Sequence, residues 1–247
     1  MSARVVCLLP ARNCERDLGG WLESVSAFAD DVVALDDGST DATGDLLAAS
    51  PLVKVLLTNE RRTGYRGWDD IANRNRLLAA AAELEPDWVI SLDADERIDR
   101  DDGDALRRFL AGEARSGWGY LFPVFAMVDD EQHYHLLPLW VGRLFAYEPG
   151  ARFRGGRLHS VPLPATIPPS RWIRTTVRIK HLAGLNRERR LARFEKYREA
   201  DPDCEFQPTY SHLLSTPATV ERWSPRPAGL PVVATDPGEL ARASTGA

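Results

Sequence analysis

The sequence has few cysteines, and those present form no recognisable pattern. Cys7, Cys14 and Cys204 are far apart in a chain of 247 residues and include no Cys-x-x-Cys pair. An odd and scattered set of cysteines argues against a disulfide framework and against a zinc site built on thiolates. A reducing compartment is therefore the default expectation.

Long hydrophobic runs are also missing. Residues 5–9 are apolar and Pro10 ends the run, which is too short for the core of a signal peptide and far short of the ~20 residues of a membrane span. No later run is long enough either. The sequence predicts a cytoplasmic protein, and peripheral attachment to the cytoplasmic face of a membrane stays open.

An excess of positive charge is the third absence. The chain has 31 Lys and Arg against 36 Asp and Glu, a net charge of -5. Proteins that bind nucleic acids need a surplus of basic residues to neutralise phosphates, so we expect no nucleic-acid partner. The length of 247 residues is ample for one continuous hydrophobic core.

Short apolar runs alternate with segments of helical periodicity through the first hundred residues. We predict strands at residues 5–9, 32–35, 53–57 and 88–92, and helices at 15–28, 41–49 and 69–84. Such repeated strand–helix units indicate an α/β fold with a mainly parallel sheet flanked by helices. Later segments predict a mixed sheet with antiparallel additions, with strands at 119–128, 137–147 and 172–179 and a helix at 186–200.

Polar motifs follow three of the predicted strands. They are Pro10-Ala11-Arg12-Asn13, Asp36-Asp37-Gly38-Ser39-Thr40-Asp41 and Asp93-Ala94-Asp95-Glu96. The carboxyl ends of parallel strands meet at one edge of a sheet, and open α/β sheets bind ligands there. We therefore expect these three motifs to form one site.

The motif Asp93-Ala94-Asp95 offers two carboxylates at positions i and i+2. On an extended segment they would point to opposite sides, so one could bind a metal while the other meets a ribose or a metal-bound water. Hard cations such as Mg²⁺ and Mn²⁺ prefer oxygen ligands and keep water or substrate phosphate in their shell. A solvated acidic turn is the alternative, and the position at a strand end favours the metal.

The motif around Asp37 is only partly explained by local structure. Gly38 permits a tight turn, and the residues after it can cap a helix. A capped turn does not account for two successive aspartates at a strand end. Asp37 could accept the N–H of a uracil-like base.

With these motifs in order, the sequence resembles the inverting family 2 glycosyltransferases of the GT-A fold. The resemblance rests on LLPARNCE, DDGSTD and LDADE, is close over residues 1 to about 100 and looser to about 200. It is nearest to bacterial sugar transferases that assemble lipopolysaccharide, capsule or other cell-surface glycans. It implies metal-dependent transfer from a nucleoside-diphosphate sugar, with UDP favoured and dTDP open, to a hydroxyl acceptor that is a glycan, a lipid-linked molecule or a small molecule.

The resemblance also implies roles for individual residues. The nucleotide pocket would be lined by Pro10, Ala11, Arg12 and Glu15, with Asp37 at the base. Asp93 would contact the ribose or the metal, Asp95 would be the main ligand of Mg²⁺ or Mn²⁺, and His181 would reach the metal or diphosphate. On the 69–84 helix, Arg74 would approach the diphosphate.

The catalytic base is where this sequence departs from the family. An inverting transferase needs a base that deprotonates the acceptor hydroxyl, but Ser160 occupies the place where related sequences have an acid. His159 could be the base, because a neutral imidazole is competent near pH 7. Alternatively Asp129, Asp130 or Glu131 could supply a carboxylate, or the transferase activity is weak or absent.

We divide the chain into a GT-A domain over residues 1–215 and a tail over 216–247. Residues 1–100 form the nucleotide-sugar half and 101–215 the acceptor half, whereas the Pro- and Ala-rich tail is expected to be poorly ordered or loosely docked. The segment 171–198 is strongly basic and could meet a diphosphate, an anionic lipid or an anionic acceptor, or be a solvated face.

Two other functions remain open at this point. A sugar nucleotidyltransferase would share the nucleotide-binding sheet, although the segment after the first strand lacks the Gly-rich loop of such enzymes. A catalytically weak donor-binding protein is the other alternative, motivated by Ser160.

Overall fold

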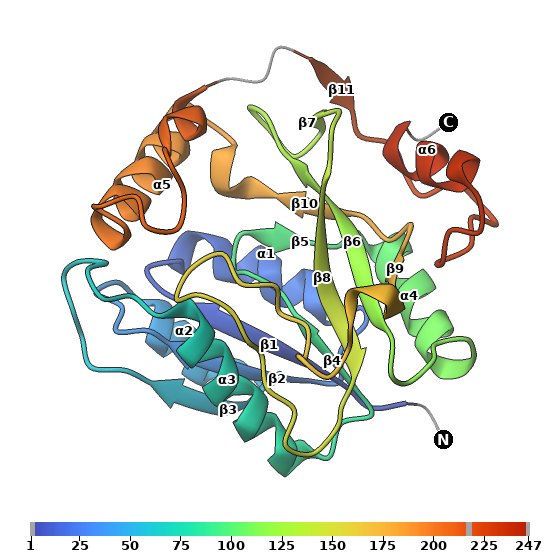
Figure 1. Cartoon of the computed structure of the whole chain (residues 1–247), viewed down its shortest axis with the longest axis horizontal. Coiled ribbons are helices and arrows are strands. Elements are labelled where there is room, and N and C mark those ends of the chain that lie inside the picture. Colours follow the sequence, from blue (N-terminus) through green and yellow to red (C-terminus); the bar gives the residue numbers. More distant parts are fainter. Residues whose placement is uncertain (1–2, 216–218, 246–247) are drawn as a thin grey trace.

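The computed structural model describes residues 3–215 and 219–245 and contains one large sheet with helices on both faces (Figure 1). The sheet has nine strands in the order β3-β2-β1-β4-β8-β6-β10-β5, with β9 paired to β6. Its strands are β1 (Val5–Ala11), β2 (Asp31–Asp36), β3 (Val53–Thr58), β4 (Trp88–Ser91), β5 (Glu96–Arg97), β6 (Gly119–Ala126), β8 (Leu139–Ala146), β9 (Trp172–Arg174) and β10 (Ile179–His181).

The first four strands run parallel and form the half of the sheet that carries the polar motifs. They are connected through α1 (Glu15–Val25), α2 (Thr43–Ala49) and α3 (Asp70–Ala81). Side chains of β1 alternate between the two faces, so that Cys7 and Leu9 pack with Trp21 of α1 while Leu8 packs with Leu77 of α3. Because both faces are covered, these strands read as continuous apolar runs in the sequence.

The second half of the sheet is mixed. β8 runs antiparallel to both β4 and β6, whereas β10 runs parallel to β6 and antiparallel to β5. This arrangement confirms the predicted α/β fold with a mainly parallel sheet and antiparallel additions. The predicted strand at 172–179 is in fact two strands, β9 and β10, because the N–H of Thr176 between them donates to the carbonyl of Val232 in the tail at 2.8 Å.

The described part of the tail, residues 219–245, contains two short regular elements. β11 (Val220–Arg222) pairs with β7 (His133–His135), and α6 (Pro237–Thr245) follows later. Trp223 is buried edge-on against Phe125 and Tyr134. The tail lacks sequence periodicity because single anchors, rather than a repeated apolar face, attach it. Residues 216–218 and 246–247 of the predicted tail lie outside the described residues.

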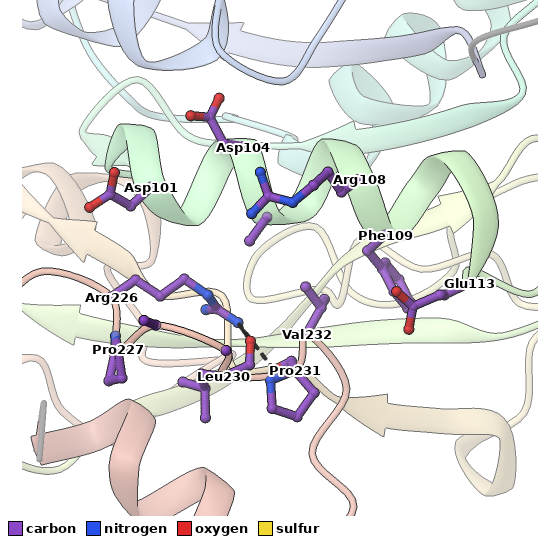
Figure 2. Close-up of a pocket in the computed structure, with 13 residues that line it drawn as sticks. Asp101, Asp104, Arg108, Phe109, Glu113, Arg226, Pro227, Leu230, Pro231 and Val232 are labelled. Atoms are coloured by element: carbon purple, nitrogen blue, oxygen red, sulfur yellow. Dashed lines mark hydrogen bonds between the residues drawn. The ribbon is translucent and has the colours of Figure 1, made fainter.

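Arg226 is the polar anchor of the tail. Figure 2 shows it among residues of the segment 226–232, facing α4 (Arg100–Gly112) across a hollow of about 490 Å³. Its Nη1 donates to Oδ1 of Asp102 at 2.7 Å, and Arg178 donates to Oδ2 of the same carboxylate at 2.8 Å. Asp102 is fully buried, and its one carboxylate is the shared ion-pair partner of two guanidinium groups.

Replacing Asp102 by alanine should therefore destabilise the whole domain. Two buried guanidinium groups would lose their counter-charge, which costs roughly 3–5 kcal/mol in the free energy of unfolding. Urea denaturation monitored by tryptophan fluorescence measures this loss. Asp101→Ala is the matched control, because Asp101 is exposed in the same helical turn and its loss should cost less than about 1 kcal/mol. Equal effects of both substitutions would contradict the proposed anchoring.

α5 (Arg187–Ala200) begins at the predicted asparagine, since the Asn186 side chain accepts the N–H of Arg189 at 2.9 Å. The helix lies beside the loop between β3 and α3 (Figure 1), where Nζ of Lys196 is 4.2 Å from the ring centre of Trp68. None of the described helices is both long and apolar enough to cross a bilayer.

Candidate active site

A cavity of about 540 Å³ opens at the carboxyl ends of the parallel strands. Its wall combines the ends of β1 and β4 with side chains of α3, β8, β10 and α5. Most of the residues predicted for the site line this one cavity, namely Pro10, Ala11, Arg12, Asp37, Arg74, Asp93, Asp95, His159 and His181. The sheet thus gathers motifs that are up to 170 residues apart in the sequence, as from Ala11 to His181.

Asp93 is held by two arginines at the end of β4. Arg74 of α3 donates to Oδ1 at 2.5 Å, and Arg143 of β8 donates to Oδ2 at 3.1 Å. Burial alone would raise the pKa of the Asp93 carboxyl, but the two guanidinium charges outweigh it and hold that pKa well below its usual range. Both oxygens of Asp93 are therefore engaged before any ligand arrives.

Asp93 and Asp95 lie on a turn instead of the extended segment that we expected. The N–H of Glu96 donates to the carbonyl of Asp93 at 3.0 Å, which closes the turn. The turn separates the partners of the two carboxylates, because Asp95 faces His181 while Asp93 faces the arginines.

Arg143 is a member of the site that sequence reasoning missed. It lies on β8 between apolar residues and is almost fully buried, and it pairs with Glu96 as well as with Asp93. A charged residue inside the apolar run LWVGRLFA was the available signal. Arg74, expected near the diphosphate, already has protein partners, since besides Asp93 it donates to Asp70 and to Ser91 Oγ, each at 2.8 Å.

Asp95 and His181 form the pair best suited to a divalent cation. Oδ1 of Asp95 lies 3.6 Å from Nε2 of His181, and both side chains are partly open to the cavity. Burial would raise the pKa of the Asp95 carboxyl, but His181 outweighs it and keeps that pKa well below its usual range, so Asp95 stays ionised. Two ligands at right angles on one ion lie about 3 Å apart, because each sits ~2.1 Å from it. The pair fits such an ion after a small adjustment.

The protein alone would not complete the shell of that ion. Among residues 3–215 and 219–245 there is no cluster of three or more His, Cys, Asp or Glu side chains arranged to hold a metal. Mg²⁺ and Mn²⁺ commonly take water and substrate phosphate as the remaining ligands. One carboxylate and one imidazole therefore favour a cation that binds together with a phosphorylated ligand, and the nitrogen ligand suits Mn²⁺ better than Mg²⁺.

The far end of the cavity contains Asp37 and Arg12. Asp37 accepts the side-chain amide of Asn59 at 2.5 Å and forms a close ion pair with Arg62. Arg12 lies over the ring of Tyr65, with its guanidinium carbon 4.2 Å from the ring centre. The Nε and Nη1 groups of Arg12 are buried without a hydrogen-bond acceptor in the described part of the chain. A ligand in the cavity could supply those acceptors.

Four predicted residues, Glu15, Asp129, Asp130 and Glu131, are not brought to the cavity. Glu15 accepts the N–H of Ala42 at 2.9 Å, so its carboxylate stabilises the start of α2. Asp129 and Glu131 are exposed in the turn that connects β6 and β7. The side chain of Asp130, also in that turn, bonds His133 at 2.9 Å.

His159 lines the cavity from a strained position, with φ at 60°. Its ring stacks on that of Tyr197 at 5.2 Å, and its Nε2 lies 3.1 Å from the hydroxyl of Tyr210. Tyr210 in turn donates to Oδ2 of Asp201 at 2.7 Å. Because the single hydroxyl proton goes to Asp201, the Tyr210 oxygen accepts from Nε2–H, which leaves Nδ1 of neutral His159 without its proton. Tyr210 and Asp201 were not foreseen from the sequence.

Comparison with models of protein families identifies the family of this chain. Residues 7–182 match the model described as glycosyl transferase family 2. The chain belongs to family 2 of the glycosyltransferases. The sheet described above is the GT-A fold of that family, as the resemblance implied. The strand-end motifs and His181 all fall within the matched residues.

Individual relatives are similar to this chain over only part of their own length. An uncharacterised protein of Mycobacterium tuberculosis is 30% identical over 213 residues, which is 82% of this chain and 52% of that protein. The lipopolysaccharide core biosynthesis glycosyltransferase LpsC of Rhizobium meliloti is 31% identical over 128 residues, covering 48% of this chain and 40% of LpsC. The chain spans about half the length of the curated relatives it matches, 52% or less. The solved S. aureus TarS 1–349 is similar at 13% identity, with a TM-score of 0.49 over 85% of this chain and 69% of that 1–349 chain.

Proposed function

We propose that this glycosyltransferase transfers a sugar from a nucleoside-diphosphate sugar, with UDP as the favoured nucleotide, to a hydroxyl acceptor with inversion at C1. The observation that carries the proposal is the shared cavity, which has Asp37 and Arg12 at one end, the Asp95–His181 pair in the wall, and His159 on the acceptor side. These groups supply in one place what donor binding, leaving-group neutralisation and acceptor activation require.

The nucleotide is proposed to bind at the ends of β1 and β2. Asp37 would accept the imide N–H of uracil, and Arg12 would donate its two unpaired N–H groups to the donor. Arg62 and Asn59 now occupy the Asp37 carboxylate. Binding of a base therefore requires that at least one of these partners is exchanged for the ligand.

A divalent cation, Mg²⁺ or Mn²⁺, would be held by Asp95 and His181, and it would neutralise charge on the diphosphate. Asp93 would serve mainly to orient Arg74 and Arg143, since both of its oxygens contact them. The resulting network fixes the turn that presents Asp95. The role of Asp93 toward the ribose thus becomes secondary to its role in positioning.

His159 is proposed to be the catalytic base. The bond between C1 and the phosphate oxygen breaks as the acceptor oxygen bonds C1, and the hydroxyl proton passes to Nδ1 of His159. Tyr210 and Asp201 keep the other nitrogen protonated, so the lone pair of Nδ1 is available. Asp129 and Glu131 lie outside the cavity wall and are less suited to this role.

The relative LpsC is a glycosyltransferase of lipopolysaccharide core biosynthesis, which favours assembly of a cell-surface glycan as the biological setting. Because the chain covers only 40% of LpsC, this setting is a proposal for the whole protein. Glycan, lipid-linked and small-molecule acceptors all contain the hydroxyl that the mechanism needs. Action at the cytoplasmic face of a membrane is compatible with each of them.

A donor panel tests the proposed function. UDP-, dTDP- and GDP-sugars are incubated with the protein, Mn²⁺ and a mixture of hydroxyl acceptors, and nucleoside diphosphate release is measured with and without EDTA. We expect turnover with a UDP-sugar, loss of at least about tenfold in rate in EDTA, and recovery on addition of Mn²⁺. Single-turnover mixing that shows tight UDP-sugar binding but no sugar transfer would instead identify a donor-binding protein. Formation of a nucleotide sugar from a sugar phosphate would identify a nucleotidyltransferase.

A further inference from the structure

The side of α5 that faces the cavity contributes three cations, Arg189, Arg193 and Lys196. Arg193 and Lys196 are three positions apart, so they lie on the same face of the helix about one turn apart. Both line the cavity that contains Asp95 and His159. Neither was singled out from the sequence, where the whole segment 171–198 is basic.

Apart from Arg12, which is proposed to contact the nucleotide, the other arginines of the cavity wall have carboxylate partners. Arg143 contacts Asp93 and Glu96, Arg74 contacts Asp70 and Asp93, and Arg189 contacts Asp17 at 2.8 Å. In the part of the chain that the structure describes, Arg193 and Lys196 form no salt bridge. Their charges are therefore available to a ligand.

Aromatic rings hold these two cations in place. Nζ of Lys196 lies 4.2 Å from the ring centre of Trp68, and Arg193 lies 6.0 Å from that of Tyr197. Such contacts orient a cation without neutralising it. A carboxylate partner would cancel the positive charge, whereas an aromatic ring does not, so the charge stays available in the cavity.

The two cations face different halves of the cavity. Nζ of Lys196 lies 4.2 Å from the ring centre of Trp68 and 5.7 Å from that of Tyr65, the ring that Arg12 also contacts, which places Lys196 on the donor side. Both cations approach the Tyr197 ring on which His159 stacks, but among the described residues only Lys196 also contacts Trp68 and Tyr65, whereas Arg193 contacts Tyr197 alone. Arg193 is therefore on the side of the attacking hydroxyl.

We propose that Arg193 binds an anionic group of the acceptor, so that the acceptor is a phosphorylated or carboxylated molecule with this group close to its reactive hydroxyl. The inference rests on the proposed function, because it takes His159 as the marker of the acceptor side. A guanidinium binds phosphate and carboxylate through paired N–H groups and discriminates against neutral hydroxyls. Lys196 would meet the diphosphate of the donor, which leaves Arg193 for the acceptor.

Paired acceptors test this assignment. Monosaccharides are offered to the protein, with the donor that turns over, in three forms: neutral, phosphorylated and as uronic acids. We expect kcat/KM to be at least tenfold higher for an anionic form than for its neutral counterpart. Arg193→Gln should remove this preference by raising KM for the anionic form at least tenfold more than for the neutral one. Arg193→Lys should retain part of the preference.

The matched control is Arg198→Gln on the same helix, because Arg198 is exposed and paired with Glu195. It should leave the preference intact. An unchanged preference in Arg193→Gln, or no preference in the parent protein for any anionic form, overturns the proposal. Failure of the proposed function looks different, since the parent would then release no nucleoside diphosphate with any donor. An effect of Arg193→Gln on the KM of the donor alone would assign Arg193 to the donor site and also overturn the proposal.

Discussion

Replacement of Asp95 by asparagine is expected to lower kcat/KM by about three orders of magnitude. The amide keeps the shape of the side chain but removes the charge that would hold the cation beside His181. Loss of a metal ion that neutralises a leaving group costs several kcal/mol of transition-state stabilisation, and ~1.4 kcal/mol corresponds to tenfold in rate. Steady-state kinetics across a Mn²⁺ titration, together with calorimetric measurement of Mn²⁺ binding in the presence of UDP, measures the change.

Two further variants locate the cation. His181→Ala should weaken Mn²⁺ binding while retaining some activity, because a carboxylate and phosphates remain as ligands. Asp45→Asn, an exposed aspartate on α2, should have no effect on either measurement. An Asp95→Asn protein that retains the Mn²⁺ affinity of the parent would move the cation away from Asp95 and reject this site.

Replacement of His159 by glutamine is expected to lower kcat by roughly 10²–10⁴-fold, the usual contribution of a general base. The parent should lose activity at low pH, since protonated imidazole cannot accept the hydroxyl proton. Burial lowers the pKa of His159 below its ordinary value of 6.5, with Arg193 and His212 acting in the same direction and Asp201 and Asp70 opposing. The acid limb of the pH–rate profile should therefore lie below pH 6.5, and it should be absent in His159→Gln.

Tyr210→Phe separates catalysis by His159 from mere packing. The hydroxyl of Tyr210, polarised by Asp201, accepts from Nε2–H and so favours the imidazolium form. Its removal should shift the acid limb to lower pH and reduce kcat by about 10–100-fold, as for other groups that orient a functional histidine. Tyr120→Phe is the control, because it removes another buried and hydrogen-bonded hydroxyl remote from the cavity. If His159→Gln retains the kcat of the parent, His159 is not the base and a carboxylate must take that role.

The parallel half of the fold and the place of the site could be read from the sequence for a physical reason. Strands buried on both faces appear in the sequence as apolar runs, and the residues that follow parallel strands lie at the same edge of the sheet. Asp37 and Asp95 could thus be placed together although 58 residues separate them, 95 minus 37. The family motifs sharpened this prediction without being needed for it.

The partners of those residues could not be read in the same way. Arg143 reaches Asp93 only because β8 pairs antiparallel with β4, and nothing local in the sequence specifies that pairing. Tyr210 and Asp201 reach His159 through the packing of a segment without regular structure on α5. The contacts of the tail could not be predicted because single residues, Trp223 and Arg226, anchor it.

The ion pair between Asp37 and Arg62 has a consequence for turnover. If the base of the donor binds at Asp37, it competes with a side chain of the same molecule, which is present at a constant and high local concentration. Donor affinity then reflects a difference between two sets of contacts and is weaker than the ligand contacts alone would give. The same competition assists departure, because Arg62 can recapture Asp37 as the spent nucleoside diphosphate leaves. The Asp37–Arg62 ion pair of the ligand-free protein would thus weaken donor binding and speed release of the product.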